Sequence, residues 1–117
     1  MYADRQSDGR EELASLASEV LKLLADPTRL RVAWLLLDGP MVVGDLAASL
    51  GRPPAAVSQH LAKMRMARIV STRRDGTSVE YRLDDEHVVH LVREVLHVAE
   101  HMVSGNPPHH RGELHEV

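Results

Sequence analysis

The chain has 117 residues, enough for one small domain, and its net charge of −3 at neutral pH does not by itself favour a nucleic-acid partner. It has no cysteine, which excludes disulfides, thiolate metal sites and cysteine nucleophiles, and no phenylalanine, so the core must be aliphatic. No apolar run approaches the ~20 residues of a membrane span and the polar N-terminus lacks the apolar stretch of a secretory signal, so we expect a cytoplasmic protein with no membrane partner.

The first part of the chain is predicted to be helical, with proline and glycine residues marking the ends of the helices. Residues 1–10 are polar, and we expect them to form a disordered N-terminal arm. Apolar residues recur at helical spacing in four later segments, which cover residues 12–25, 27–37, 44–50 and 54–66. Asp26 is a suitable N-cap for the second of these helices, and Gly51 ends the third. The third and fourth helices, joined by a short turn that contains this glycine, are typical of a helix-turn-helix.

The second part of the chain begins with a period of two residues, which indicates strands. The expected strands cover residues 69–73 and 77–83. Between them, Asp75-Gly76 is typical of a tight hairpin turn. A long helix is expected over residues 84–103, and a histidine-containing tail over residues 105–117. Because a hairpin directly after a helix-turn-helix is a wing, we predict a mainly α-helical winged helix-turn-helix domain over residues 11–104.

Basic residues are concentrated in one segment of an otherwise acidic chain. Residues 52–82 hold seven Arg and Lys and two acidic residues, a net charge of +5, whereas the rest of the chain has a net charge of −8. A local basic segment of this kind is typical of a surface that binds nucleic acid, although a solvated charged face has the same composition.

Polar and basic side chains lie on the outward face of the helix expected over residues 54–66. The apolar residues of this helix share the opposite face, and they are Val57, Leu61 and Met64. The side chains left outward or at the edge are suited to DNA bases or phosphates, and they are Ser58, Gln59, His60, Lys63 and Arg65. Arg73 and Arg74 lie at the tip of the expected wing, within reach of the DNA backbone or an adjacent minor groove. We therefore predict double-stranded DNA as a partner.

Three segments of the chain resemble the ArsR/SmtB family of metalloregulators. They are LLADPTRLRVAWLL, DLAASLG and VSQHLAKMRMARIVSTRRDGTSVEYRL, and the resemblance covers roughly residues 12–103. It implies a homodimer whose first and last helices form the interface, and which binds a palindromic operator when metal-free. The residues that the resemblance assigns to DNA contacts are Ser58, Gln59, His60, Arg73 and Arg74. The chain departs from the family at Val42-Val43, where a serine or threonine N-cap is common, so we expect the third helix to be weakly capped.

Histidines are concentrated late in the chain, where seven of the eight lie after residue 86. On the last helix, spacings of three and four residues bring five ligand-type side chains within an arc of roughly 80°, namely His87, His90, Glu94, His97 and His101. His87 and His101 are about 21 Å apart along one helix, so they cannot share an ion within one subunit. An antiparallel pair of these helices with a two-fold axis near Glu94 brings His87 to His101 of the partner subunit. The stripe therefore predicts two equivalent metal sites across a dimer.

The expected ligands also include residues outside this stripe. Glu100 adjoins His101, and the tail carries two further histidines after a linker long enough to fold back. The predicted metal ligands are His87, Glu100, His101, His109 and His110, drawn from two subunits. A second set of candidate ligands is Asp85, His90 and His97. For its two histidines, a proton-sensitive pair and plain polar residues at the edge of an interface remain alternatives; His115 has no assigned role.

The donor chemistry narrows the choice of metal. Imidazole and carboxylate groups without a thiolate disfavour Cu(I), arsenite, cadmium and lead. Five or six N/O donors favour Ni(II) or Co(II) in octahedral coordination, while a tetrahedral subset suits Zn(II). The ligand pattern resembles the nickel- and cobalt-sensing branch of the family. The zinc-sensing pattern of the family is incomplete here, because its middle ligand position falls on Val98.

We therefore expect a metal-responsive transcriptional repressor that Ni(II) or Co(II) releases from its operator, with a zinc-responsive repressor as the main alternative. A winged-helix repressor that responds to a small molecule or to pH remains open, as does a dimeric module whose wing binds protein. An enzyme is not expected, and neither is a small-molecule substrate, because the sequence shows no glycine-rich phosphate loop and no nucleophile with a credible base.

Overall fold

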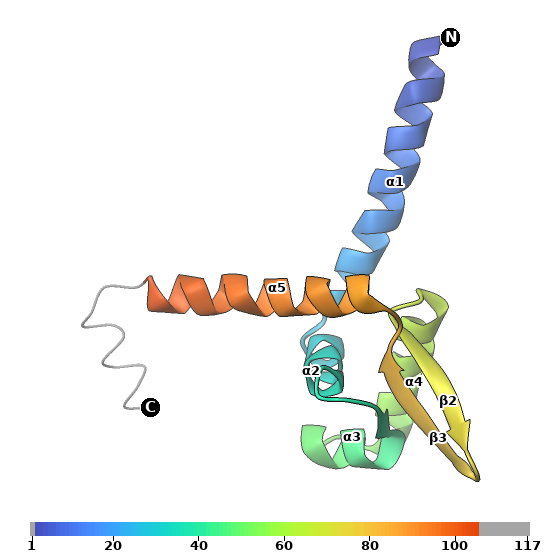
Figure 1. Cartoon of the computed structure of the whole chain (residues 1–117), viewed down its shortest axis with the longest axis vertical. Coiled ribbons are helices and arrows are strands. Elements are labelled where there is room, and N and C mark those ends of the chain that lie inside the picture. The colour runs from blue at the N-terminus through green and yellow to red at the C-terminus, as the bar shows by residue number, and fades with distance from the viewer. Residues whose placement is uncertain (1, 106–117) are drawn as a thin grey trace.

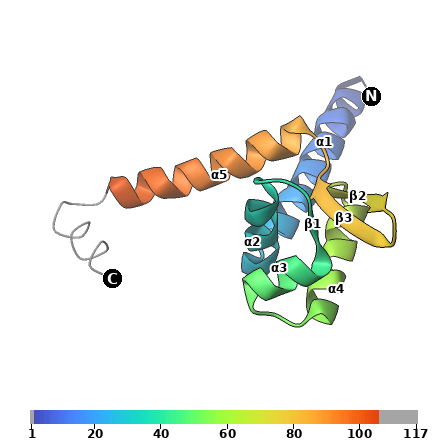
Figure 2. The same ribbon diagram turned by 60° about the horizontal axis from the view of Figure 1, so that its bottom comes forward.

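The computed structural model describes residues 2–105, with side chains described from residue 9, as five α-helices and a three-stranded antiparallel sheet (Figure 1). In chain order the elements are α1 (Tyr2–Leu24), α2 (Pro27–Leu36), β1 (Met41–Val42), α3 (Val43–Leu50), α4 (Pro54–Met66), β2 (Val70–Asp75), β3 (Ser78–Leu83) and α5 (Glu86–Ser104). Figure 2 shows that α2, α3 and α4 form one cluster with the sheet beside it. The prediction of a mainly α-helical winged helix-turn-helix is confirmed.

Side-chain and glycine caps mark the ends of several helices. Asp26 is the N-cap of α2, because its Oδ2 accepts a hydrogen bond from the backbone N–H of Arg29 at 3.0 Å. This hydrogen bond holds the pKa of the Asp26 carboxyl below its usual value. Gly51 ends α3 in the left-handed conformation with φ of 66°, which residues with a Cβ rarely adopt. Val42 precedes α3 without a side-chain capping bond, as expected for a position that lacks serine or threonine.

The wing is a hairpin extended by a third strand. β2 and β3 pair antiparallel from Val70↔Leu83 at the base to Asp75↔Ser78 at the tip. β1 pairs with the free edge of β3, so the strand order is β1-β3-β2. The sequence does not predict β1, because its two residues are too few to show the alternation of a strand.

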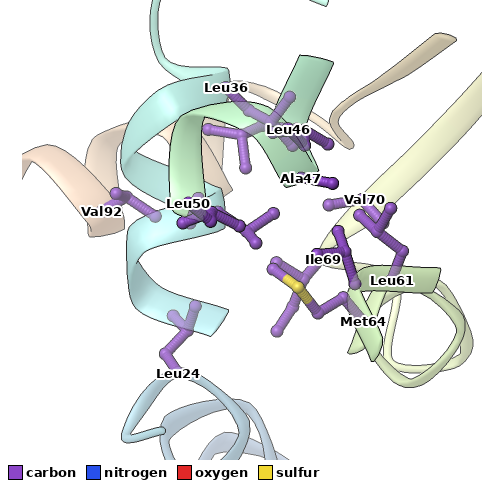
Figure 3. Packing of buried hydrophobic residues seen from close by; sticks show 14 residues of the cluster. Leu24, Leu36, Leu46, Ala47, Leu50, Leu61, Met64, Ile69, Val70 and Val92 are labelled. Carbon is purple, nitrogen blue, oxygen red and sulfur yellow. The ribbon is translucent and has the colours of Figure 1, made fainter. Parts of the chain in front are cut away.

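The core is aliphatic, as the composition predicts, with Met64 as its only buried sulfur-containing side chain among the described residues (Figure 3). α2, α3 and α4 contribute three buried residues each, whereas α1 contributes only Leu24 and α5 only Val92. No described polar or charged residue is buried. Trp34 lies on α2 and is 57% exposed, so the single tryptophan does not belong to the core.

α1 and α5 extend away from this core in different directions (Figure 1). Large apolar side chains remain 50–69% exposed on them, and these are Leu13, Leu16 and Leu21 on α1 and Val98, Met102 and Val103 on α5. Long helices with apolar side chains in water are typical of elements that pack against another copy or another protein. No helix in the described part of the chain is both long and apolar enough to cross a membrane.

The start of α1 differs from the expectation for the N-terminus. The sequence predicts a disordered arm over residues 1–10, but the helix already begins at Tyr2. The polarity of this segment indicates that it is not part of a core, and polarity does not prevent a helix from continuing along a segment without proline. The remaining helices begin and end within about two residues of their predicted bounds.

Candidate DNA-reading face and metal-binding helix

α4 buries one face and exposes the other, as the sequence predicts. Val57, Leu61 and Met64 are completely buried. The predicted DNA contacts on this helix are exposed or half-buried, the exposed ones being Ser58, Gln59, Lys63 and Arg65 and the half-buried one His60. Their contact with DNA stays a prediction, but all of them are available at the surface of the helix-turn-helix.

These residues do not form a single patch along α4. Ser58 and Gln59 lie in the first half of the helix, which adjoins the turn from α3. Arg65 lies about 10 Å farther along the axis, near the base of the hairpin. There it lines a shallow cleft with Arg68 and Asp84. Arg65 is therefore better placed for a phosphate at the margin of a site than for the bases that Ser58 and Gln59 can reach.

The ring of His60 contacts an arginine side chain of another helix. The guanidinium Nη1 of Arg29, in the first turn of α2, lies 3.3 Å from Nδ1 of His60. The Nε of the same guanidinium donates to the backbone carbonyl of Leu23 at 2.6 Å. Asp26 lies close enough for the charge of His60, when protonated, to contribute to its lowered pKa. His60, at the edge of the α4 face that is predicted to contact DNA, is thus connected to the junction between α1 and α2.

The two wing arginines lie on opposite faces of the hairpin, because successive residues of a strand alternate. Arg74 pairs with Val79 and shares its face with the buried Val70 and Leu83. Arg73 pairs with Glu80 on the other face, so a carboxylate is its cross-strand neighbour. Both arginines are exposed near the tip of the wing. The two arginines therefore have different cross-strand neighbours, since a carboxylate lies opposite Arg73 and an apolar side chain lies opposite Arg74.

The histidine stripe of α5 is exposed to solvent over its whole length. The predicted ligands on or beside this helix are exposed, namely Asp85, His87, His90, His97, Glu100 and His101, and Glu94 of the stripe is exposed as well. Asp85 is the N-cap of α5, since its Oδ1 accepts the Val88 N–H at 3.0 Å. His97 Nδ1 lies 3.8 Å from a carboxylate oxygen of Glu94, and this pair is ionic only when the imidazole is protonated.

The described residues of one subunit do not bring three ligand-type side chains together around a point that could hold a metal ion. This agrees with the spacing along α5, where His87 and His101 are separated by about 21 Å. The tail residues His109 and His110 lie outside the described residues. The donors that are present, imidazoles and carboxylates, fit a divalent transition metal, but a complete site needs ligands from beyond this part of one subunit.

The stripe adjoins the exposed apolar flank of α5. Glu94, His97 and His101 line a shallow surface cleft together with Val98 and Met102. Apolar side chains and side chains of ligand type therefore share one side of the projecting half of the helix. This arrangement is suited to a helix–helix contact that brings imidazoles from two helices close together.

Comparisons with known proteins agree with this architecture. Residues 26–72 match the family described as bacterial regulatory protein, arsR family. Over 112 residues the chain is 51% identical to the HTH-type transcriptional regulator KmtR of Mycobacterium tuberculosis, an alignment that covers 95% of the chain and 86% of KmtR. The chain belongs to the ArsR family.

A second relative and a solved structure extend the comparison. NmtR of Mycobacterium tuberculosis, also an HTH-type transcriptional regulator, is 35% identical over 99 residues, covering 85% of the chain and 82% of NmtR. The homodimeric winged helix-turn-helix DNA-binding domain Mb0332 of Mycobacterium bovis superimposes with a TM-score of 0.80 at 29% identity, covering 85% of the chain and 92% of that domain. The chain is thus a transcriptional regulator of the KmtR type, in the metalloregulatory branch of the family, and not an enzyme.

The contact between Arg29 and His60 is the feature of this site that the sequence does not predict. The two residues are 31 positions apart, and no local periodicity connects them. The Asp26 N-cap does predict the start of α2 and therefore the backbone position of Arg29, but not the direction of its side chain. The hairpin turn also differs from the prediction, because Gly76 and Thr77 form it between the paired Asp75 and Ser78, one residue later than Asp75-Gly76. The pairing of Arg73 with Glu80 and of Arg74 with Val79 therefore does not follow from the predicted turn.

Proposed function

We propose that this ArsR-family regulator is a homodimeric repressor that binds a palindromic operator when metal-free and leaves it when Ni(II) or Co(II) binds between the α5 helices of its two subunits. The observation that carries the proposal is the stripe of exposed ligand-type residues on α5, next to an exposed apolar flank. A repressor that binds operator DNA acts in the cytoplasm, and we propose this location for the protein.

Dimerisation through α1 and α5 is supported by the side chains that these helices leave in water. Six large apolar residues on them are at least 50% exposed in one subunit. Burial of such surface against a second copy is favourable by about 25 cal/mol per Å² of apolar area. The similar domain Mb0332 is homodimeric. A two-fold axis then repeats every contact, so any site that spans the interface occurs twice.

The ligands that we assign to each site come from both subunits. With the two-fold axis near Glu94, antiparallel α5 helices bring His87 to His101 of the partner subunit. Glu100 adds a carboxylate, and His109 and His110 of the tail complete a set of five N/O donors. A set of this size suits the octahedral preference of Ni(II) and Co(II), whereas Zn(II) needs only four of the donors. When bound, the ion supplies a cross-link between the subunits.

Release from DNA follows from the way α5 is connected to the wing and to α4, the elements that we propose to bind DNA. An operator with two half-sites requires two recognition helices about 34–36 Å apart. α5 follows β3 directly and packs against α2, so a change in the crossing of the two α5 helices moves the wing and α4 of each subunit together. A coupling free energy of about 1–3 kcal/mol is typical for such two-site regulation, and it corresponds to a 5–150-fold change in affinity.

The test measures the affinity of the full chain for a DNA duplex that the metal-free protein selects from a random pool, with and without Ni(II), Co(II) or Zn(II). We expect Ni(II) or Co(II) to weaken binding by about tenfold or more. His101→Ala should bind DNA normally without metal and lose this response, because His101 is exposed and supports no core packing. Glu86→Gln, also exposed on α5, is the matched control and should respond like the unmodified chain.

The other outcomes separate the alternatives. Release by Zn(II) alone would assign the zinc-responsive function to the same site. Release that depends on pH in the presence of a chelator would indicate a repressor with a non-metal effector. Unchanged DNA affinity with all three metals would refute the metal-responsive proposal, and the absence of any salt-dependent DNA binding would refute the repressor itself.

A further inference from the structure

The guanidinium group of Arg29 connects three helices, namely α1, α2 and α4, of which α4 is the proposed recognition helix. Arg29 belongs to the first turn of α2, and its backbone N–H is fixed by the carboxylate of Asp26 at 3.0 Å. Its side chain donates to the Leu23 carbonyl in the last turn of α1 at 2.6 Å and lies 3.3 Å from Nδ1 of His60 on α4. With its backbone and its Nε both held, the guanidinium has little freedom to leave His60.

The chemistry of the two groups decides which ring nitrogen carries the proton. A guanidinium has five N–H donors and no acceptor, and it stays charged throughout the range in which proteins fold. Nδ1 of His60 must therefore accept the hydrogen bond with its lone pair, and the single proton of the neutral ring lies on Nε2. A ring with protons on both nitrogens has no lone pair on Nδ1 and cannot accept this hydrogen bond.

We infer that Arg29 is a positioning residue that fixes the tautomer and the orientation of the His60 ring, so that the recognition helix offers a single N–H donor, Nε2, at the edge of its reading face. His60 is half-buried on α4, next to the exposed Gln59. A donor in this position can bind an acceptor of DNA, which is a phosphate oxygen or an acceptor on a base edge such as guanine O6 or N7. This last step rests on the proposed function, whereas the tautomer does not.

The first experiment observes the ring directly in the full chain, without DNA and without metal. Two-bond ¹H–¹⁵N correlation spectra of histidine-labelled protein at mildly alkaline pH distinguish a protonated from an unprotonated ring nitrogen, and His60→Gln identifies the His60 signals by their loss. We expect an unprotonated Nδ1 and a protonated Nε2 in the unmodified chain. In Arg29→Gln the Nδ1 and Nε2 shifts should move towards the average of the two tautomers. A proton on Nδ1 in the unmodified chain would overturn the inference, and so would His60 signals that are identical in Arg29→Gln.

The second experiment is a double-mutant cycle on DNA affinity, read with the duplex selected by the metal-free chain. Arg29→Gln and His60→Ala should each weaken binding by about tenfold, the usual effect of one hydrogen bond that involves a charged group. The double variant should bind no more weakly than His60→Ala, because Arg29 acts only through the ring. Independent losses that multiply to about a hundredfold would overturn the positioning role.

Two further variants separate positioning from general stability. Arg31→Gln removes a charge from the exposed side of the same helix and should leave both the ring signals and the DNA affinity unchanged. Arg29→Lys keeps the charge but cannot bridge Leu23 and His60 with one planar group, and it should shift the His60 signals even if Arg29→Gln folds poorly. His60 signals like those of the unmodified chain in folded Arg29→Lys would count against the inference.

The acceptor on DNA is identified by comparing sequences. A phosphate contact predicts that His60→Ala weakens binding by the same factor on every duplex, whereas a base contact predicts loss on the selected duplex only. If the chain binds no DNA at all, the proposed function fails while the spectroscopic result still stands. The proposed function and the inferred tautomer of His60 can therefore be refuted independently of each other.

Discussion

Asp26 is the residue whose contribution to the stability of the fold is defined most clearly. It caps α2 through the Arg29 N–H, and the exchange of an N-cap for alanine costs about 1 kcal/mol of stability. We expect Asp26→Ala to lower the free energy of unfolding by about this amount near neutral pH. Asp26→Asn keeps a capping oxygen without the charge and should lose less. Urea unfolding at constant protein concentration measures both variants.

The capping contribution of Asp26 should also depend on pH, with a defined sign. Because the folded-state pKa of the carboxyl is lowered, its stabilisation is fully present above the unfolded aspartate pKa of about 3.9 and is lost as the pH falls through the lower folded value. The difference in stability between the unmodified chain and Asp26→Asn should therefore shrink below about pH 4. A difference that stays constant through this acid range would contradict the assignment.

The tail histidines are predicted to decide between metals. His109 and His110 raise the number of donors above the four that zinc needs, so their removal should affect Ni(II) and Co(II) more than Zn(II). We expect His109→Ala/His110→Ala to lose more of the nickel or cobalt response than of the zinc response in the DNA-release assay. His115→Ala is a control in the same tail. Equal losses for the three metals would remove the tail from the site.

At the residue scale, the sequence predicts side chains whose role follows from local spacing. The burial of Val57, Leu61 and Met64 is confirmed, because a helix with a period of 3.6 residues has only one face to bury. The contact between Arg29 and His60 was out of reach of such reasoning. It depends on how α2 crosses α4, and that crossing is decided by the packing of the whole core.

The two arginines of the wing have different cross-strand neighbours, and this difference should be measurable in the salt dependence of DNA affinity. Arg74 has Val79 as its cross-strand neighbour, while Arg73 has Glu80. If the wing contacts phosphates, Arg74→Gln should reduce the slope of the logarithm of affinity against the logarithm of salt concentration by about 1. Arg73→Gln should reduce it less, because Glu80 already offsets part of that charge. Titrations at several salt concentrations test this order, and a larger effect of Arg73→Gln would contradict the smaller contribution to DNA binding that we assign to Arg73.

Among the elements, those with long periodic patterns were predicted well and the short one was missed. α4 follows the helical period, and its bounds agree with expectation. The bounds of β2 and β3 agree within two residues, although the turn between them lies at Gly76-Thr77, one residue later than predicted. β1 exists only because the edge of β3 lies beside Met41–Val42 in the folded chain, and this neighbour is not visible in the local sequence. The helical start of α1 was missed because polarity was taken to indicate disorder.

At the scale of the whole molecule, the exposed apolar side chains of α1 predict the oligomeric state. Leu16 is 60% exposed on the apolar side of this helix. Leu16→Glu would bury a charge in the proposed interface, so we expect it to dissociate the dimer into 13.0-kDa monomers and to weaken operator binding. Ser15→Glu, on another side of α1, is the matched control and should remain dimeric. Light scattering after size-exclusion chromatography measures the mass, and a dimeric Leu16→Glu would place the interface elsewhere.

The candidate metal site could be predicted as a pattern but not as a geometry. The His87, His90, Glu94, His97 and His101 stripe indicates ligands for a metal, and its length along one helix indicates that a single subunit cannot complete a site. The described part of one subunit agrees with this, since it holds no group of three ligands. The distances that decide coordination number belong to the proposed dimer and to residues after Gly105, so they follow neither from the sequence nor from one described subunit.

The scarcity of aromatic residues makes this protein optically simple. Trp34 is its only indole, and it lies exposed on α2, the helix that contacts α1, α3, α4 and α5. The intrinsic fluorescence of each subunit therefore has one dominant emitter, in the element that connects the projecting helices to the DNA-reading helices. Unfolding, assembly and effector binding can be followed in real time from this one emitter, without an introduced dye and without the overlapping signals of several tryptophans.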